Sequence, residues 1–290
     1  MSSDSVRRTR SSSSLVASAA VCAALYALVN IATSFIQTPF GIGEFRPGVV
    51  IPAFFAITAG PLPAALGAGV GSFVGDMISL VPFGKSTFIW ALGGGAVGNF
   101  LGFLVLGYVY DKLRNWKGFI FGTTAGLFIG NLVAAAGVVF LGMLLMPSSG
   151  LNIFAGMPPF TALGWVTGLL LFWFGTMFPF VIILVPPLLR FMRPYASSLS
   201  VTRSYPDLRE ANKKLLWGWS ILVAALVLAA LLVALLSGLA GVKTVVSFYG
   251  GSLNWEYLFA ISAVLVIVLG AFLPQISSPK KVEQTEASRV

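Results

Sequence analysis

The chain alternates between long apolar runs and short polar breaks. Six apolar runs lie before residue 193, and two more follow residue 214. Most contain about 20 residues, which is enough for a helix to cross a hydrocarbon core of about 30 Å. Because lipid offers the backbone no hydrogen-bond partners, such runs are expected to be helices. The predicted helices cover roughly residues 15–37, 48–59, 62–80, 87–110, 118–146, 160–189, 215–240 and 257–274.

Polar stretches divide these helices into groups. Residues 1–14 are rich in serine and arginine, and we expect a disordered cytoplasmic tail there. Residues 15–192 form a predicted six-helix membrane core, and residues 193–214 form a basic cytoplasmic linker. Residues 215–274 hold the two further membrane helices, and residues 275–290 form a second cytoplasmic tail.

The composition agrees with a lipid environment. Hydrophobic residues make up 57% of the chain and charged residues only 9%, whereas a soluble domain carries about 25% charged residues. The predicted fold class is therefore all-α. It is a polytopic membrane bundle, with a six-helix core and two additional C-terminal transmembrane helices.

The positive charge is unevenly distributed along the chain. Of the 18 lysines and arginines, all but Arg46, Lys85 and Lys243 fall in segments that would share one side of the membrane. Because cytoplasmic loops carry an excess of these residues, both termini are predicted to be cytoplasmic, in the plasma membrane. This distribution explains the net charge of +9 without nucleic acid as a partner.

Several kinds of chemistry are disfavoured by the residues present. The chain has no histidine and one cysteine, Cys22, so a disulfide within the chain and a site of histidine and cysteine ligands are excluded. No nucleophile–base pair, paired carboxylates or metal-ligand spacing is evident. We therefore expect no metal, no cofactor and no enzymatic activity.

Glycines recur at intervals of four residues on three of the predicted helices. Glycine costs helix stability, so regular glycines inside membrane helices favour close contact between backbones. The three ladders are Gly67, Gly71 and Gly75; Gly94, Gly98 and Gly102; and Gly122, Gly126 and Gly130.

Three polar residues lie inside apolar runs. Charges at such depth usually face a cavity or a partner, so Asp76 either contacts a ligand or ion-pair partner in a cavity or caps its helix near the membrane surface. Asn99 and Asn131 lie near the middle of their helices, where interhelical hydrogen bonding and ligand contact are the two alternatives.

Charged and aromatic residues gather at the predicted outer side. Glu44, Arg46 and Lys85 are the charged residues of the first two outer loops, and Trp90 and Trp165 begin two of the helices. Aromatic faces with a few charges suit a flat, polar heterocycle. Each tryptophan taken alone also fits the aromatic belt at a membrane interface.

A stripe of small residues marks the first helix. Small side chains let another helix come close, either a partner's helix or one of this chain. The stripe comprises Ala19, Ala20, Ala23, Ala24 and Ala27.

Three segments resemble a known family. They are Ala-Gly-Pro-Leu-Pro-Ala-Ala-Leu-Gly at 59–67, Gly-Asp at 75–76 and Trp-Ala-Leu-Gly-Gly-Gly at 90–95. They resemble the substrate-binding S components of energy-coupling factor (ECF) transporters, and within them the riboflavin-transporter-like branch. The resemblance spans roughly residues 15–192.

This resemblance implies a six-helix protein that binds a vitamin or a related compound from outside. The alanine stripe would dock on a transmembrane coupling subunit, which two cytoplasmic ATPases drive. The two C-terminal helices are extra relative to the family, and no ATP-binding cassette motif is present, so energy would come from another chain. The implied binding residues are Glu44, Phe45, Arg46, Lys85, Trp90, Asn131 and Trp165, to which the residue argument adds Asp76.

The first hypothesis is therefore the substrate-capture subunit of an ECF-type importer, with riboflavin as a guess from the branch. One alternative is a stand-alone secondary transporter that uses Asp76 as an ion or proton site. Another is a membrane assembly or scaffold protein without transport activity.

Overall fold

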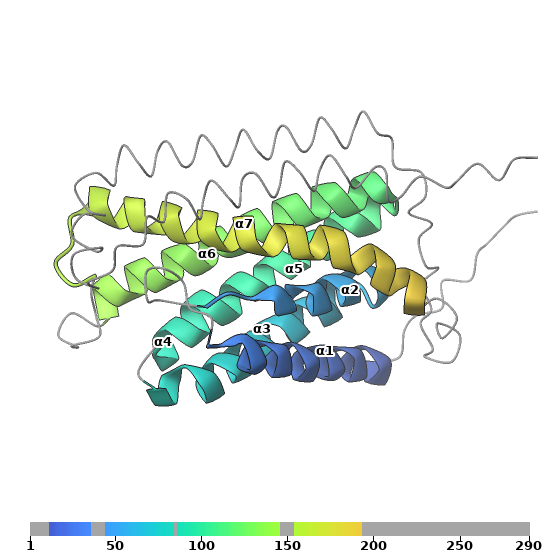
Figure 1. The fold of residues 1–290 in the computed structure, drawn as a ribbon, viewed down its shortest axis with the longest axis horizontal. Helices are drawn as coiled ribbons and strands as arrows, with labels where there is room; N and C mark the ends of the chain where they lie inside the picture. Colours follow the sequence, from blue (N-terminus) through green and yellow to red (C-terminus); the bar gives the residue numbers. More distant parts are fainter. Residues whose placement is uncertain (1–11, 36–43, 84–85, 146–153, 193–290) are drawn as a thin grey trace, which may run out of the picture.

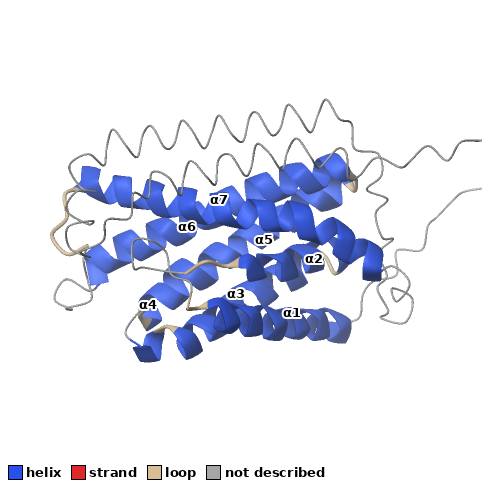
Figure 2. Ribbon diagram, viewed as in Figure 1, coloured by secondary structure: helices blue, strands red, loops and turns tan. Residues whose placement is uncertain are grey.

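The computed structural model describes residues 12–35, 44–83, 86–145 and 154–192. Every regular element in these ranges is helical (Figures 1 and 2). The elements are α1 (Ser12–Thr33), η1 (Pro47–Val49), α2 (Val50–Thr58), α3 (Pro61–Ser79), η2 (Val81–Phe83), α4 (Phe88–Trp90), η3 (Ala91–Ala96), α5 (Val97–Leu113), α6 (Trp116–Leu145) and α7 (Pro159–Met192).

Five helices in the described ranges are long and apolar enough to cross a membrane. They cover Ser12–Thr33, Pro61–Ser79, Phe88–Leu113, Trp116–Leu145 and Pro159–Met192, and the second of these spans joins on to a shorter apolar helix, Pro47–Thr58, that precedes it. The chain is thus an all-α, multi-pass membrane bundle, as the hydropathy pattern predicts. The linker, the two C-terminal helices, the C-terminal tail and residues 1–11 of the predicted N-terminal tail lie outside the described residues. Residues 12–14, which were expected in that tail, belong to the first turn of α1, since the helix begins at Ser12.

The first helix is shorter than its apolar pattern predicts. It was expected to reach residue 37, but it ends at Thr33. The Ser34 hydroxyl donates to the Ile31 carbonyl at 2.9 Å, and the Thr33 hydroxyl donates to the Val29 carbonyl at 2.9 Å. Because such hydroxyls compete with the backbone for carbonyl acceptors, they favour the end of a helix even inside an apolar run.

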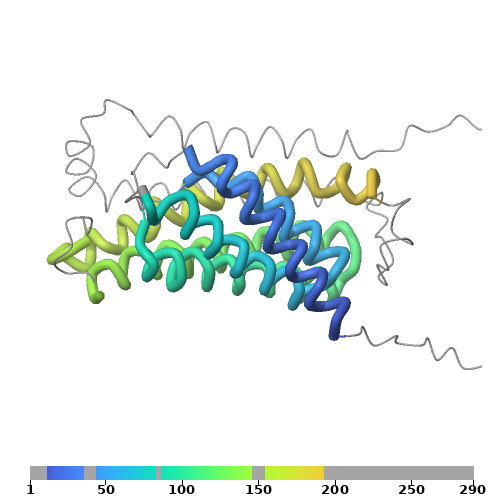
Figure 3. The backbone as a smooth tube through the Cα atoms, turned by 90° about the horizontal axis from the view of Figure 1, so that it is seen from below, coloured from blue at the N-terminus to red at the C-terminus, as the bar shows by residue number. Residues whose placement is uncertain are grey.

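The helices pack side by side in pairs. α1 packs on α3 and runs in the same direction, whereas α5 packs antiparallel on α6, and α7 covers α6 and α2 (Figure 1). Seen from below, α1 crosses the bundle obliquely at its edge (Figure 3). Only 22% of its apolar window is buried, against 61% for α3 and for α7, so α1 is the most peripheral span.

The glycine ladders mark the tightest helix contacts, as predicted. A Cβ atom added at Gly126 would lie 2.5 Å from the Gly102 carbonyl oxygen, and one at Gly71 would lie 2.7 Å from the Ala23 carbonyl oxygen. No side chain fits at either position without moving the facing backbone. The ladders therefore set how closely α5 approaches α6 and α3 approaches α1.

Residues 44–46, which we call the extended segment, lead into η1 without helical structure and lie inside the bundle. Glu44 is fully buried and Arg46 is 6% exposed, although both were expected in an outer loop. Non-helical backbone at membrane depth is tolerated only where protein buries it or a cavity adjoins it. The helix formed by η1 and α2 is correspondingly short, because the extended segment covers the first part of the same passage through the membrane.

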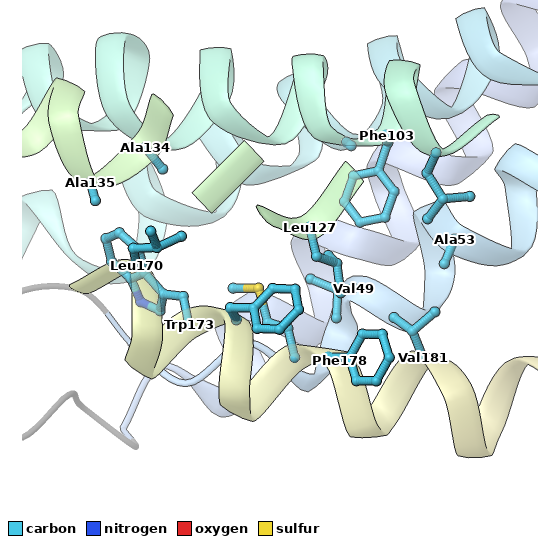
Figure 4. Close-up of a cluster of buried hydrophobic side chains, with 14 of the residues drawn as sticks. Val49, Ala53, Phe103, Leu127, Ala134, Ala135, Leu170, Trp173, Phe178 and Val181 are labelled. Atoms are coloured by element: carbon cyan, nitrogen blue, oxygen red, sulfur yellow. The ribbon is translucent and has the colours of Figure 1, made fainter. Parts of the chain in front are cut away.

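Side chains fill one half of the bundle. Phe103, Leu127, Phe178 and Val181 pack between α5, α6 and α7, next to Val49 and Ala53 (Figure 4). A hollow lies beside Trp173, towards the end of the bundle where α3 ends and α4 begins. We call this end the α3–α4 end.

Candidate functional site

Arg46 is the centre of a buried ion-pair cluster. Its Nη2 donates to Asp76 Oδ1 at 2.5 Å, and its Nη1 donates to the Ser72 hydroxyl at 2.6 Å. Its Nε lies 3.5 Å from Glu44 Oε1. Ser72 and Asp76 are one helical turn apart and so share a face of α3. The extended segment carries Arg46 directly to that face.

Hydrogen bonds continue from this cluster to two other helices. Asn99 Nδ2 donates to the Ser72 hydroxyl at 3.2 Å and to the Gly95 carbonyl at 2.8 Å. The Tyr26 hydroxyl donates to Asn99 Oδ1 at 2.8 Å. We call the set Tyr26, Glu44, Arg46, Ser72, Asp76 and Asn99 the polar network. It joins α1, α3 and α5 to the extended segment, and it confirms the interhelical hydrogen bonding predicted for Asn99.

The network contains one cation and two carboxylates. Each of these groups is at least nine-tenths buried. Charges in such surroundings persist because they neutralise each other and find hydrogen bonds, and removing one partner typically costs about 3–5 kcal/mol. With Glu44 and Asp76 ionised, the formal charge of the cluster is −1.

A hollow of about 480 Å³, part of it at an open mouth, lies beside the network. It extends from the α3–α4 end to Asn99 in the first turn of α5 and to residues near the middle of α6 and α7. Polar and aromatic side chains from several elements converge on it. Its lining residues are Arg46, Asp76, Leu80, Ser86, Trp90, Gly95, Asn99, Asn131, Ala134, Val138, Trp173 and Met177.

A π-helix forms part of the wall. η3 joins α4 to α5, and Gly95 within it faces the network. A Cβ atom added at Gly95 would lie 2.8 Å from Asp76 Oδ2 and 3.2 Å from the Ser72 hydroxyl. Single π-turns are rare in helices and occur frequently at functional sites. Here the turn brings a residue without a side chain next to the carboxylate.

Aromatic rings close one side of the hollow. The Phe154 ring lies between two predicted site residues, with its centroid 6.0 Å from that of Trp90 and 5.4 Å from that of Trp165. Trp90 lies in the first turn of its helix, where the Thr87 hydroxyl accepts from the Trp90 backbone nitrogen. Trp165 is buried behind Phe154 and is not a lining residue.

The structure brings four predicted binding residues to one hollow: Arg46, Asp76, Trp90 and Asn131. Glu44 contacts Arg46 and does not line the hollow. The Phe45 ring packs edge-on against Phe180, with centroids 5.4 Å apart. Lys85 lies outside the described residues. Whether a ligand contacts these residues stays a prediction.

The alanine stripe of α1 has mixed surroundings. Ala27 is buried, and Ala23 presents its backbone to Gly71 of α3. Ala19 presents its carbonyl to Gly67 in the same way. Ala20 and Ala24 are exposed on the opposite face. Internal packing therefore accounts for part of the stripe, and the exposed part is the pair Ala20 and Ala24.

Several lining or network residues were missed in the sequence. Ser72 had a usable signal, because it stands four residues before Asp76 on the same helix face. Trp173 and Met177 stand four residues apart on α7, which is also a signal for a shared face. Tyr26 gave no signal, since its contact with Asn99 depends on how α1 crosses α3 and α5.

Comparison with protein families, with curated proteins and with solved structures found no match. The functional conclusion therefore depends on the chemistry of the hollow. In the described part of the chain, no three His, Cys, Asp or Glu side chains gather to hold a metal ion. What the arrangement offers is non-covalent recognition by charges, amide groups and indole rings.

Proposed function

We propose that the chain is the membrane-embedded substrate-capture subunit of an ECF-type importer. It binds a vitamin or a related small molecule from outside, and partner subunits drive uptake with ATP. Its site is in the plasma membrane, with both termini in the cytoplasm. The partners are a transmembrane coupling subunit and two cytoplasmic ATPases.

The observation that carries this proposal is the hollow beside the polar network. Ligand pockets combine predominantly apolar walls with a few placed polar groups. The hollow has this combination, because Arg46, Asp76 and two asparagines stand among apolar and indole side chains. By the distribution of lysine and arginine, the α3–α4 end faces outward. A receptor that loads from outside needs its mouth at that end.

The segments that resemble the family add support. Residues 75–76 and 90–95, which carry part of the resemblance, contribute Asp76, Trp90 and Gly95 to the hollow. Riboflavin remains a guess from the branch resemblance. The hollow favours a compact, flat guest, because indole rings and methyl groups form much of its wall.

The experiment is to purify the full chain in detergent and identify by mass spectrometry what co-purifies. We expect a bound vitamin-like molecule, and we expect the chain to form a stable complex with a coupling subunit and two ATPases when co-expressed. Reconstituted vesicles of the chain alone should not accumulate the molecule. Uphill accumulation by the chain alone, or no ligand and no complex, would contradict the proposal.

A stand-alone secondary transporter is the second candidate, because the buried carboxylates of Glu44 and Asp76 share a single guanidinium. A site of this kind could exchange a proton or cation during transport. In that case Asp76→Asn abolishes pH-dependent uptake by the chain alone. For the importer we expect uptake to require ATP. Asp76→Asn should then lower ligand affinity, and uptake should not depend on a pH gradient in either the original chain or the variant.

A further inference from the structure

Three buried N–H donors around the hollow have no hydrogen-bond acceptor among the residues that the structure describes. They are Nε1 of Trp90, Nε1 of Trp173 and Nδ2 of Asn131. The three side chains are 5%, 6% and 6% exposed and come from α4, α7 and α6. All three residues line the hollow. Figure 4 shows Trp173 projecting from α7 towards Ala134 of α6, which is also a lining residue.

Such donors are costly when nothing accepts from them. A buried polar group without a partner loses roughly 1–3 kcal/mol relative to one that is paired. The donors belong to three different helices, so no single local rearrangement would pair all of them. An occupant of the hollow that presents acceptors would remove the cost for all three at once.

Two acceptors at the hollow are already engaged, while Asp76 Oδ2 lies against Gly95 of the wall. Asn99 Oδ1 accepts from Tyr26, and Asp76 Oδ1 accepts from Arg46. In the described part of the chain, the hollow thus offers its guest mainly donors. The guest must supply carbonyl oxygens, ring nitrogens or similar acceptors.

The charges oppose an anionic guest. Among the described residues, the charged groups at the hollow are Arg46 and Asp76, with Glu44 next to Arg46. The guanidinium already contacts both carboxylates and Ser72. With both carboxylates ionised the cluster carries a net charge of −1, and with one protonated it is neutral. In either case an added carboxylate or phosphate would find no unpaired cation at the hollow among the described residues, in surroundings of low dielectric constant.

We propose that the hollow selects a neutral, flat molecule whose edge carries several hydrogen-bond acceptors, and that it discriminates against the anionic counterpart of the same ring. The acceptors of the guest receive hydrogen bonds from Trp90, Trp173 and Asn131, and the polar network disfavours binding of the anion. This inference rests on the proposed function, since it names the substrate class for that site. It does not depend on which partner proteins supply the energy.

The first arm of the test compares matched probes on the purified full chain. The probes are riboflavin and nicotinamide, each paired with an acidic counterpart, flavin mononucleotide and nicotinate. Thermal stabilisation and equilibrium dialysis report binding. We expect at least one neutral probe to bind, with its acid at least about 10-fold weaker, a ratio of about 1.4 kcal/mol. An acid that binds as tightly as its neutral partner, or no binding by either neutral probe, overturns the inference.

The second arm removes single donors while keeping an aromatic ring at the two tryptophan positions. Trp90→Phe and Trp173→Phe should each weaken binding of the neutral probe roughly 5- to 10-fold, the usual effect of one lost hydrogen bond. Asn131→Leu keeps the approximate side-chain size and should do the same. The control is Trp116→Phe, because Trp116 is also buried with an unpaired Nε1 but lies outside the hollow, packed on Phe119.

The pattern across these variants decides the matter. Loss of affinity in Trp90→Phe and Trp173→Phe, with Trp116→Phe unchanged, supports the inference. Equal losses in all three, or no loss in any, overturns it, and melting temperatures show whether each variant is folded. If a neutral probe binds but no ATPase module associates, the proposed function fails and the inference stands. If the module associates but the bound molecule is an anion, the inference fails and the proposed function stands.

Discussion

Arg46 determines how the site is held together. A single guanidinium contacts residues from its own extended segment and from α3, and the network then continues to α5 and α1. The planar, five-donor geometry of arginine suits such branching, whereas a lysine would make only point contacts. The position therefore requires arginine rather than any cation.

Replacing Arg46 tests this dependence. Arg46→Gln should lower the stability of the detergent-solubilised chain by about 3–5 kcal/mol, because two buried carboxylates lose their counter-charge. Adding Asp76→Asn should restore part of the loss, and a double-mutant cycle on unfolding free energies measures the coupling. The control is Arg190→Gln at an exposed arginine, which we expect to change stability by less than about 0.5 kcal/mol. Additive effects of the two substitutions would mean that the Arg46–Asp76 ion pair does not contribute to stability.

Gly95 is the second residue on which the site depends. Alanine is a better helix former than glycine by up to about 1 kcal/mol, so Gly95→Ala would stabilise an ordinary helix. Here its Cβ would lie 2.8 Å from Asp76 Oδ2, and the carboxylate would have to leave Arg46. We expect lower thermal stability and weaker ligand binding. Gly93→Ala is the control, since its Cβ would meet only the end of the Leu141 side chain. A stabilised Gly95→Ala variant would contradict this placement of Asp76.

At the scale of the elements, the α5–α6 pair is a wall whose spacing glycine sets. Gly98 and Gly102 on α5 face Gly126 and Gly130 on α6, backbone against backbone. Asn131 and Asn99 stand next to these glycines in sequence, so their distance across the hollow depends on the same spacing. Helix packing and site geometry are thus coupled at this pair.

Gly126→Ala should push the two helices apart. The added methyl group would meet the Gly102 carbonyl oxygen at 2.5 Å, and the facing backbone cannot rotate away as a side chain could. Overpacking of this kind typically costs about 1–3 kcal/mol. Unfolding of the purified variant measures the loss, with Gly93→Ala again as the matched control. Equal unfolding free energies for the two variants would mean that α5 and α6 can move apart without a loss of stability.

The helix positions were largely predictable, and the site was predictable only in part. Apolar length fixed α3, α6 and α7 to within about three residues at each end, because lipid imposes one strong rule on the backbone. The burial of Glu44 and Arg46 was not predictable, because a polar loop and a polar segment folded back into a bundle have the same composition. Asp76 was recognised as unusual, but its partner could be found only once α3 and the extended segment were placed side by side.

At the scale of the whole molecule, one buried apolar cluster runs along the bundle and the hollow adjoins it at one end. The hollow and the polar network lie towards the α3–α4 end, beside Trp90, and the same cluster continues to Phe103 and Val181. α1 lies at the edge of this assembly with one face exposed. A partner that docks there would leave the hollow untouched.

This separation gives a prediction for partner binding. Ala24→Trp, on the exposed face of α1, should leave melting temperature and ligand affinity near their original values but abolish association with a coupling subunit. Ala27→Trp is the contrasting variant and should destabilise the chain itself, because Ala27 is 6% exposed. Co-purification with the coupling subunit is the measurement. If Ala24→Trp still associates fully, this face of α1 meets lipid rather than a partner.

The π-turn of η3 has a consequence for how the guest of this protein could change during evolution. Ala91–Ala96 accommodates one residue more than regular winding would. Deleting a single residue there would restore the ordinary winding and leave Trp90 and α5 close to their present orientation, because the π-turn fits its extra residue into about the same rotation. A short deletion could thereby alter the wall beside Asp76 while the indole stays at the hollow.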